Sequence, residues 1–586
     1  MCYMPKEVFM KFFFFLSFLT ISAIVVLANS ATLIGPWDQN SWMIGAYLSM
    51  KGEVLPMESW PLPEGFIKQY LSSDQSSSPS TISHTPFASA SLPYAIRHVP
   101  YAINGHTPSA MSPATTTNFF MRFSPEISAN NWPVYIPSSS YIDLTQAYRY
   151  DSLKPWMVFG YQTNIGNKLY FLIRMDLRKE IANFFEKDDH DNLPFTGLNF
   201  SLSPSEEAFD FNFPDEGYAS YYSKNFFFNF GRSKLSWGPM IHGLTLSDNS
   251  PYYDEGSFIY TTPADFIKRF SFTYNAISVN PILTQAEYYE QSHYLDPMAD
   301  QIYDEPSKYL FAHRIDFLVT NNFRIGLGEL DLVGGKFPDL TDFNPFIIWH
   351  NVYGRGYSNS FGSLDFSYVP VKSLQLYGEF ALDQDQNPVT PEPTPGNVPA
   401  DYKPVAYGYG IGAKYSWGNW NDMSQMGVEY YYTLPWMYNR WEPYLKFTNR
   451  IMRLSNDPPS IFYTDYPFGY MYGPDAQTLD IFFRKHIDNI DIDSGFMWLR
   501  KGSNTTLTPY NPDEYYLVTP SGTVEDTKDL YTKVSFSISE NLSLFGSMDL
   551  RYVKNFMNQD NPLGNAVLGN AWLYDFSFGF QYSYND

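Results

Sequence analysis

The end of the chain alternates aromatic residues with small or polar ones at every second position. The aromatic positions are Phe576, Phe578, Phe580, Tyr582 and Tyr584, and the residues between them are Ser577, Gly579, Gln581 and Ser583. A period of two places all the aromatic side chains on one face of a β-strand. Such a face fits either the edge of a β-sandwich or the lipid-facing side of a strand that closes an outer-membrane barrel.

The same alternation recurs from about residue 156 onward, and in many segments the second face carries ionisable residues. Examples are the segments 169–177, 314–319, 374–382 and 405–415. Because an unpaired buried charge is costly, these faces do not suit the dry core of a sandwich, whereas the lumen of a barrel is polar. The pattern predicts an all-β protein that forms a large transmembrane antiparallel β-barrel. At about 20–27 residues per strand with its connection, this region would form about 16–20 strands.

The sequence between residues 31 and 150 lacks this regular pattern. It contains a serine-rich stretch over residues 72–91 and repeated prolines, and residues 62–71 suit the start of a short helix. We therefore expect an irregular, partly helical N-terminal region at 31–150, plug-like or periplasmic, followed by the barrel at 151–586. Alternatively, this region contains the first strands of the sheet, hidden by their irregularity.

The first 30 residues have the three-part layout of a secretory signal peptide. Lys6 and Lys11 precede an apolar run over residues 12–28, and small residues stand at the expected cleavage site. A signal peptide over residues 1–30, cleaved after Ser30, predicts export and a location in the outer membrane. An uncleaved signal anchor is the alternative, since the apolar run is almost long enough to span a bilayer.

Composition agrees with a membrane barrel and excludes one class of partner. The 586 residues include 48 Tyr and 49 Phe, yet the mean hydropathy is only −0.30, as expected when a lipid face alternates with a wet lumen. The net charge of −23 repels nucleic acid. The one cysteine, Cys2, lies in the expected signal peptide, which excludes zinc–thiolate sites and cysteine nucleophiles from the mature chain.

Four short elements follow one another in the middle third of the chain. In chain order they are Phe230-Gly231-Arg232-Ser233-Lys234-Leu235-Ser236-Trp237-Gly238-Pro239 with Leu244-Thr245-Leu246-Ser247-Asp248-Asn249-Ser250-Pro251; His313-Arg314-Ile315-Asp316-Phe317 with Gly326-Leu327-Gly328-Glu329; Asn344-Pro345-Phe346 with His350-Asn351; and Leu376-Tyr377-Gly378-Glu379-Phe380 with Asp383-Gln384. This series covers about residues 225–385 and resembles the Wzi family of capsule-assembly outer-membrane proteins. The serine-rich region and the chain after about residue 400 show no comparable motif. The resemblance implies a barrel with a helical N-terminal part that helps to attach capsular polysaccharide to the cell surface.

Six residues in these elements are candidates for a polysaccharide-binding surface. Aromatic faces take the apolar side of a pyranose, while amides and carboxylates take its hydroxyls. The candidates are Trp237, Asp248, Asn249, Asn344, His350 and Asn351. The competing interpretation is structural, because Gly-Pro after Trp237 and the polar residues before Pro251 are both typical of turns.

Five further residues are predicted to form a charge network in the barrel lumen: Arg232, His313, Arg314, Asp316 and Glu329. Such a network would stiffen the wall, or would form a selectivity ladder in a porin. The sequence lacks G-x-S-x-G, H-E-x-x-H and Walker motifs. The acidic segment 186–192 does not have the spacing of a calcium loop. We therefore predict no catalytic residues, no metal and no cofactor.

These features predict a non-enzymatic outer-membrane barrel that binds or organises capsular polysaccharide at the cell surface. A porin or substrate-selective diffusion channel is the alternative, and an outer-membrane hydrolase is a third class. The expected partners are surface polysaccharide, outer-membrane lipids and, during biogenesis, the barrel-assembly machinery, with no nucleic acid. The glycan and the oligomeric state are left open. One structural observation separates the first two functions. If the N-terminal region and the loops around 240–255 and 340–360 fold into the lumen, the polysaccharide-binding function is favoured; a clear pore would favour the porin.

Overall fold

The computed structural model describes most of the chain after residue 115 and two short parts before it. The described residues are 33–35, 38, 41–63, 66–67, 116–132, 141–142, 144–166, 168–181, 184, 197–200, 209–223, 225–262, 269–293, 295–296, 301–351, 357–385, 393–394, 396–398, 402–456, 459–556 and 569–585. The expected signal peptide, the serine-rich stretch and the acidic segment 186–192 lie outside these residues.

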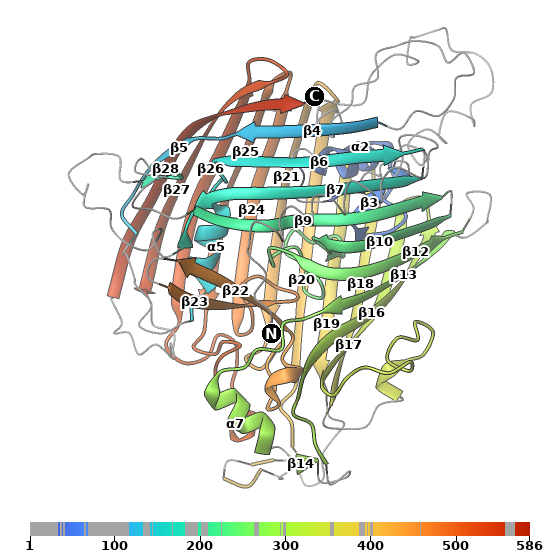
Figure 1. The fold of residues 1–586 in the computed structure, drawn as a ribbon, viewed down its shortest axis with the longest axis vertical. Coiled ribbons are helices and arrows are strands. Elements are labelled where there is room, and N and C mark those ends of the chain that lie inside the picture. The colour runs from blue at the N-terminus through green and yellow to red at the C-terminus, as the bar shows by residue number, and fades with distance from the viewer. Residues whose placement is uncertain are drawn as a thin grey trace, which may run out of the picture.

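The described strands close into an antiparallel barrel of 18 strands (Figure 1). In spatial order its wall consists of β10 (Phe226–Ser233), β12 (Tyr253–Thr261), β13 (Arg269–Ser278), β16 (Glu305–Thr320), β17 (Phe323–Gly335), β18 (Ser358–Val371), β19 (Leu374–Gln384), β20 (Ala406–Asn419), β21 (Asp422–Thr433), β24 (Ala476–Ile487), β25 (Ile490–Lys501), β26 (Glu525–Ser537), β27 (Leu542–Phe556), β28 (Gly569–Asn585), β4 (Thr116–Phe123) with β5 (Glu126–Asn130), β6 (Met157–Ile165) with β8 (Gly197–Leu198), β7 (Leu169–Lys179) and β9 (Phe209–Ser223). Here β4 and β5 occupy one position in the wall, because both pair with β28, and β6 and β8 together occupy the next. The predicted fold class and strand number are confirmed.

The C-terminal strand β28 closes the barrel. Along one edge it pairs with β27, and along the other with β4 and β5, for example through Tyr582 opposite Phe123 and Phe578 opposite Ile127. All five aromatic residues of the alternating pattern are exposed on one face, and Phe578 is 61% exposed. The segment predicted to be either a sandwich edge or the closing strand is therefore the closing strand.

Large apolar side chains face outward around the whole wall. They alternate along the strands with buried or polar residues, and examples are Phe317, Leu327, Leu364, Ile411, Val428, Ile481, Phe496 and Val534. A continuous exposed apolar band of this kind is the lipid-contacting surface of an outer-membrane barrel. Among the described residues, no helix is long and apolar enough to cross a bilayer.

The two ends of the barrel differ in the length of their connections. At the end where β28 terminates, strands follow each other through short turns, such as those between β16 and β17, β20 and β21, and β24 and β25. At the opposite end the connections are long and carry α7 (Gln285–His293) and the η3 turn (Pro443–Leu445) (Figure 1). Short turns are periplasmic and long loops extracellular in such barrels, which gives the orientation of the chain.

The barrel begins earlier than residue 151. Strands β4 and β5 belong to its wall, so within the described residues the barrel sheet already includes Thr116, and the expected boundary at residues 150 and 151 is wrong. The alternative, that the N-terminal region hides the first strands, holds. The cause is the break at Ser124-Pro125, because proline cannot donate a ladder hydrogen bond and divides the strand into two short, unpatterned pieces.

Part of the N-terminal region lies inside the wall. Helix α2 (Trp42–Lys51) sits near the periplasmic end, where Tyr47 stacks on Trp420 with ring centroids 4.5 Å apart and the Val54 amide donates to the Asn321 carbonyl at 2.9 Å (Figure 1). The chain then forms β2 (Ser59–Trp60) in mid-lumen, next to β3 (Leu62–Pro63), which pairs with β1 (Leu33–Ile34). The residues of β2 pair with β11 (Ser236–Trp237).

Long connections contribute the remaining elements. Inside the wall, residues 234–252 after β10, which include β11, form what we call the lumen loop. The connection after β5 carries α5 (Leu144–Ser152), and the connection after β21 carries the hairpin of β22 (Thr448–Asn456) and β23 (Pro459–Pro467). Other connections carry η2 (Trp349–Asn351), η4 (Pro512–Glu514) and the short strand pair β14 (Leu295–Asp296) and β15 (Gln301–Ile302).

Candidate functional site

Two arginines and two aspartates form a closed ion quartet in the lumen. Arg314 and Asp316 come from β16, Arg324 from β17 and Asp365 from β18. The four ion pairs that join each arginine to both aspartates measure 2.6–2.8 Å, and no side chain of the quartet is more than 1% exposed. Equal numbers of opposite charges compensate each other, which is the condition under which burying them is tolerated.

The ion quartet contacts the elements that fill the lumen. Ser59 in β2 donates to Asp316 at 3.5 Å, and the Arg314 guanidinium lies 5.9 Å from the centre of the Trp237 ring. Trp237 is almost fully buried between the wall and β2, so this predicted ligand residue is closed to a saccharide from outside. Its role in the structure is packing.

Two carboxylates of the wall hold the lumen loop. Glu379 accepts hydrogen bonds from the Thr245 hydroxyl at 2.6 Å and from the Leu244 amide at 3.1 Å. Glu429 accepts from the Ile241 amide at 3.3 Å and from the hydroxyls of Tyr377 and Tyr431. In the same loop, burial lowers the pKa of His242, so the imidazole is neutral at physiological pH. The wall and the loop are thereby one packed unit.

His313 and Glu329 are not lumenal, contrary to the prediction. His313 Nε2 and Glu329 Oε2 are 3.1 Å apart, on the face of the wall that carries the exposed Phe317 and Leu327. Neighbouring residues of a strand face opposite sides, so His313 and the lumenal Arg314 cannot share a network. Arg232 likewise lies on an outward face and pairs with Asp254 at 2.8 Å. Only Arg314 and Asp316 of the five predicted residues lie together in the lumen.

The other predicted ligand residues fall in two separate places. Asp248 and Asn249 lie in the lumen loop, where the Asn249 side-chain amide donates to the Gly469 carbonyl at 3.1 Å. Asn344 and His350 lie in the exposed connection after β17, and Asn351 ends η2 in the same connection. The six residues therefore do not form one surface.

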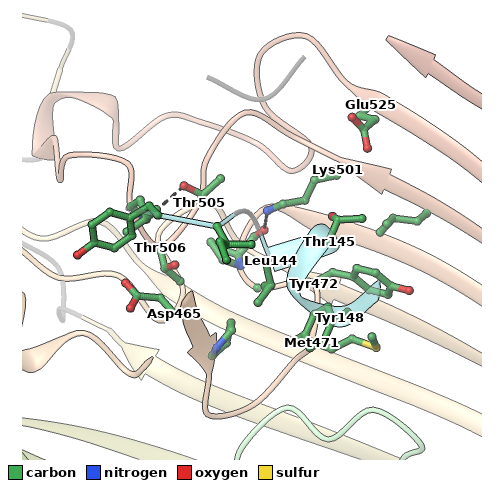
Figure 2. Close-up of a pocket in the computed structure, with 17 residues that line it drawn as sticks. Leu144, Thr145, Tyr148, Asp465, Met471, Tyr472, Lys501, Thr505, Thr506 and Glu525 are labelled. Atoms are coloured by element: carbon green, nitrogen blue, oxygen red, sulfur yellow. Dashed lines mark hydrogen bonds between the residues drawn. The ribbon is translucent and has the colours of Figure 1, made fainter. Parts of the chain in front are cut away.

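A pocket that the sequence did not reveal opens at the extracellular end (Figure 2). It is lined by α5 with the residues just before it, by the segment after β22, and by the ends of β25 and β26 with their connection. Its lining includes Tyr141, Leu144, Thr145, Tyr148, Asp465, Met471, Tyr472, Lys501, Thr505, Thr506 and Glu525. The cavity itself measures about 80 Å³, below the roughly 300–1,000 Å³ of sites that enclose a whole small ligand, so the pocket would hold part of a sugar residue with the rest of the chain at its open mouth. We call it the tyrosine pocket.

The lining of the tyrosine pocket is fixed by neighbouring contacts. Arg450 holds Asp465 in place through bonds of 2.6 and 2.7 Å, and it also bonds Glu287 of α7. Helix α5 is docked through Asp151, which accepts from the Tyr466 hydroxyl at 2.5 Å and from Arg453. The Lys501 ammonium donates to the Asn504 carbonyl at 2.8 Å and so pins the connection after β25.

Tyr148 gives the tyrosine pocket an aromatic face and an unusual hydroxyl. Burial raises the pKa of Tyr148 well above its usual range, so the hydroxyl remains a neutral donor. This hydroxyl is buried and has no hydrogen-bond partner within the part of the chain that the structure describes. Since buried polar groups are nearly always satisfied, we expect water or a ligand group to complete it.

One segment of the sequence has a composition typical of a binding loop. Residues 463–474 read Tyr-Thr-Asp-Tyr-Pro-Phe-Gly-Tyr-Met-Tyr-Gly-Pro, a run rich in tyrosine, glycine and proline within a long connection. Binding residues are disproportionately found on loops. Nothing in the sequence, however, places this run beside α5, more than 300 residues earlier.

No protein-family model matches the sequence, and no curated protein matches it. Among solved structures, the fold is similar to that of Wzi from Escherichia coli, described as an outer-membrane protein involved in group 1 capsule assembly and as a carbohydrate-binding β-barrel. The TM-score is 0.53 at 14% identity, over 94% of this chain and 99% of that chain. OccK5 (OpdH) of Pseudomonas aeruginosa and a BenF-like porin of Pseudomonas fluorescens Pf-5 each give a TM-score of 0.36 over 80% of this chain and 98% and 99% of their own, at 8% and 9% identity. The likeness to Wzi confirms the predicted resemblance at the level of the fold.

Proposed function

We propose that this outer-membrane barrel is a non-enzymatic protein that binds surface polysaccharide, of the capsular type, at its extracellular end. One observation carries the proposal: the tyrosine pocket opens at the extracellular mouth of a barrel whose lumen is occupied by α2, β2 and the lumen loop. The likeness in fold to a carbohydrate-binding barrel supports it.

The chemistry of the tyrosine pocket suits a sugar. The rings of Tyr141, Tyr148 and Tyr472 offer apolar faces for a pyranose, and the buried Tyr148 hydroxyl, which lacks a partner among the described residues, is the polar group that a sugar hydroxyl could complete. Asp465 is nearly buried and bonded by Arg450 through both carboxylate oxygens, so it holds the lining in place. Asn249 would contribute to binding indirectly, because its hydrogen bond to Gly469 supports the segment that contains Met471 and Tyr472.

A porin is the competing function. An unfilled barrel of this strand number would contain an aqueous channel. Here the ion quartet, Glu379 and Glu429 tie the filling elements to the wall, which argues for a scaffold over a conduit. Conductance in planar bilayers tests this point: the proposal expects a closed full-length protein, and sustained open conductance would count heavily against it.

Binding is tested with the purified full-length protein and the isolated surface polysaccharide of the producing bacterium. We expect Tyr141→Leu to weaken binding roughly tenfold, since an aromatic contact is worth about 0.5–1.5 kcal/mol beyond its area. Tyr516→Leu is the matched control, because this tyrosine is 60% exposed on the connection after β25 and does not line the pocket. Equal binding by the two variants would refute the tyrosine pocket as the site. Loss of cell-associated polysaccharide with normal secretion in a deletion strain would support the cellular role.

A further inference from the structure

The connection after β17 lies against the outside of the wall. We call residues 337–351 of this connection the outer loop; in Figure 1 it is the yellow-green segment beside β17. Phe346 stacks on Phe272 of β13 with ring centroids 5.6 Å apart, and the Tyr274 hydroxyl donates to the Phe343 carbonyl at 3.2 Å. Both β13 residues face outward, next to the lipid-facing band. We propose that the outer loop is embedded in the outer leaflet and binds lipid acyl chains.

The outer loop covers polar groups that would otherwise face lipid. The His313 and Glu329 pair lies on the outward face, and the Glu329 carboxylate accepts from the backbone amides of Trp349 at 3.2 Å and His350 at 2.8 Å. The Trp349 indole stacks on the His313 imidazole at 4.4 Å. Ionisable side chains at lipid depth are costly unless they are paired and screened. The wall itself supplies the pair, and the outer loop adds the amide donors and the Trp349 ring that screen it.

The outer loop also buries apolar wall residues on the extracellular side of the His313 and Glu329 pair. Phe311, Val333 and Trp349 form a cluster with no exposed surface, although Phe311 and Val333 belong to outward faces of β16 and β17. The outer loop therefore replaces lipid as the cover of the wall at this height.

The outer loop exposes five large apolar side chains alongside the polar Asp339, Thr341, Asn344 and His350. Its exposed large side chains are Phe337, Leu340 at 89%, Phe343, Phe346 at 79% and Ile348. This surface continues the exposed band of the wall, where Phe270 contacts Phe317 with ring centroids 6.1 Å apart. Since the band is in contact with acyl chains, the same chains meet the outer loop.

The conformation of the outer loop is fixed in advance of any contact. The Asp342 carboxylate accepts from the Asp339 amide at 2.6 Å, and Lys336 pairs with Asp339 at 3.0 Å. Lipid would thus meet a preformed surface, with little ordering cost.

Single cysteines carrying an environment-sensitive fluorophore test the proposal in the full-length chain, with Cys2 changed to serine. Leu340→Cys and Phe346→Cys probe the outer loop, and Val518→Cys, 73% exposed on the connection after β25, is the control. In phosphatidylcholine vesicles containing doxyl-labelled acyl chains, we expect the two outer-loop labels to be quenched severalfold more than the control, and to be protected from aqueous iodide. A near-ultraviolet circular dichroism spectrum like that of the parent shows that each variant is folded.

Two results would overturn the proposal. One is quenching of both outer-loop labels by iodide as strong as at residue 518, with no effect of doxyl lipids. The other is oxidative cross-linking of Phe346→Cys between two chains without lipid quenching, which would assign the surface to a second copy of this protein. Neither result depends on polysaccharide binding, so this proposal and the proposed function fail independently.

Discussion

Asn249 and Gly469, 220 residues apart, are joined by a hydrogen bond of 3.1 Å from the asparagine amide to the glycine carbonyl. This bond connects the lumen loop to the segment that lines the tyrosine pocket. Ser247 adds two more, because its amide donates to Phe468 at 2.7 Å and its hydroxyl to Gly469 at 2.5 Å. The floor of the proposed binding site is therefore held by the element that fills the barrel.

Removing the Asn249 amide should weaken polysaccharide binding without preventing folding. A net hydrogen bond contributes about 0.5–1.5 kcal/mol, so we expect Asn249→Ala to lower the affinity roughly threefold to tenfold. Titration calorimetry with the isolated surface polysaccharide measures this change. Asn344→Ala is the control, since that side chain is exposed outside the pocket lining and accepts from the nearby amide of Phe346, at 3.1 Å. Unchanged affinity in Asn249→Ala would show that the pocket floor does not depend on the lumen loop.

Much of the wall could be predicted because lipid imposes a strict period. The aromatic positions of β28, from Phe576 to Tyr584, correctly predict which face of this strand points outward and that the strand closes the barrel. The same rule, applied to His313 and Arg314, would have separated them, since adjacent residues cannot share a lumenal network. The prediction grouped them by charge alone and was wrong for His313.

The site could not be predicted in the same way. Its lining joins Tyr148 to Tyr472 and Lys501, and no local pattern encodes contacts across hundreds of residues. The amide chemistry of Asn249 makes it a candidate ligand residue in the sequence, whereas the structure shows it bonded to Gly469. Turn-forming residues in a barrel loop have the composition of a sugar site even where they hold the loop itself.

Breaking the ion quartet should be strongly destabilising. Asp365→Asn leaves two buried arginines facing one aspartate, and loss of one partner of a buried pair costs about 3–5 kcal/mol. Guanidinium unfolding followed by tryptophan fluorescence in detergent gives the change. The double variant Arg324→Met with Asp365→Leu removes one charge of each sign, and we expect it to lose less stability than Asp365→Asn. A double variant that is less stable than the single one would contradict charge balance as the cause.

Gly326 provides the space for the Arg314 guanidinium. A Cβ atom at this position would lie 2.1 Å from Arg314 Nη2 and 2.6 Å from Asp365 Oδ2. We expect Gly326→Ala to cost about 1–3 kcal/mol in the free energy of unfolding, as overpacking usually does. Gly362→Ala on neighbouring β18 is the matched control, because its Cβ would have no neighbour within 4 Å. Equal unfolding midpoints for the two variants would exclude crowding of the quartet.

Glu58 should make the docking of the N-terminal segment depend on pH. This carboxyl is buried in the lumen beside Trp60, whose indole nitrogen donates to it at 3.1 Å, and burial raises its pKa. Because the pKa of Glu58 is higher in the folded than in the unfolded protein, its protonated carboxyl stabilises the fold fully below the unfolded pKa of about 4.5. This stabilisation is lost as the pH rises through the pKa of the folded state. Hydrogen exchange of residues 41–63 should therefore accelerate from pH 4.5 upward, after correction for intrinsic exchange, and Glu58→Gln should abolish this dependence. Arg324, Lys414 and Asp365 act on the same carboxyl, so a slope that persists in Glu58→Gln would assign it to the surrounding charges.

The N-terminal segment should also restrict ion flow. The described residues between 33 and 63 lie within the wall, with α2 at the periplasmic end and β2 paired to β11 in mid-lumen. Barrels of 16–18 strands leave an aqueous channel when nothing fills them, so deletion of residues 33–63 should raise single-channel conductance above that of the full-length protein. The lumen loop remains tied to Glu379 and Glu429, so we expect the opening to be partial. A folded deletion variant that conducts no better than the parent would mean that the loop alone closes the lumen.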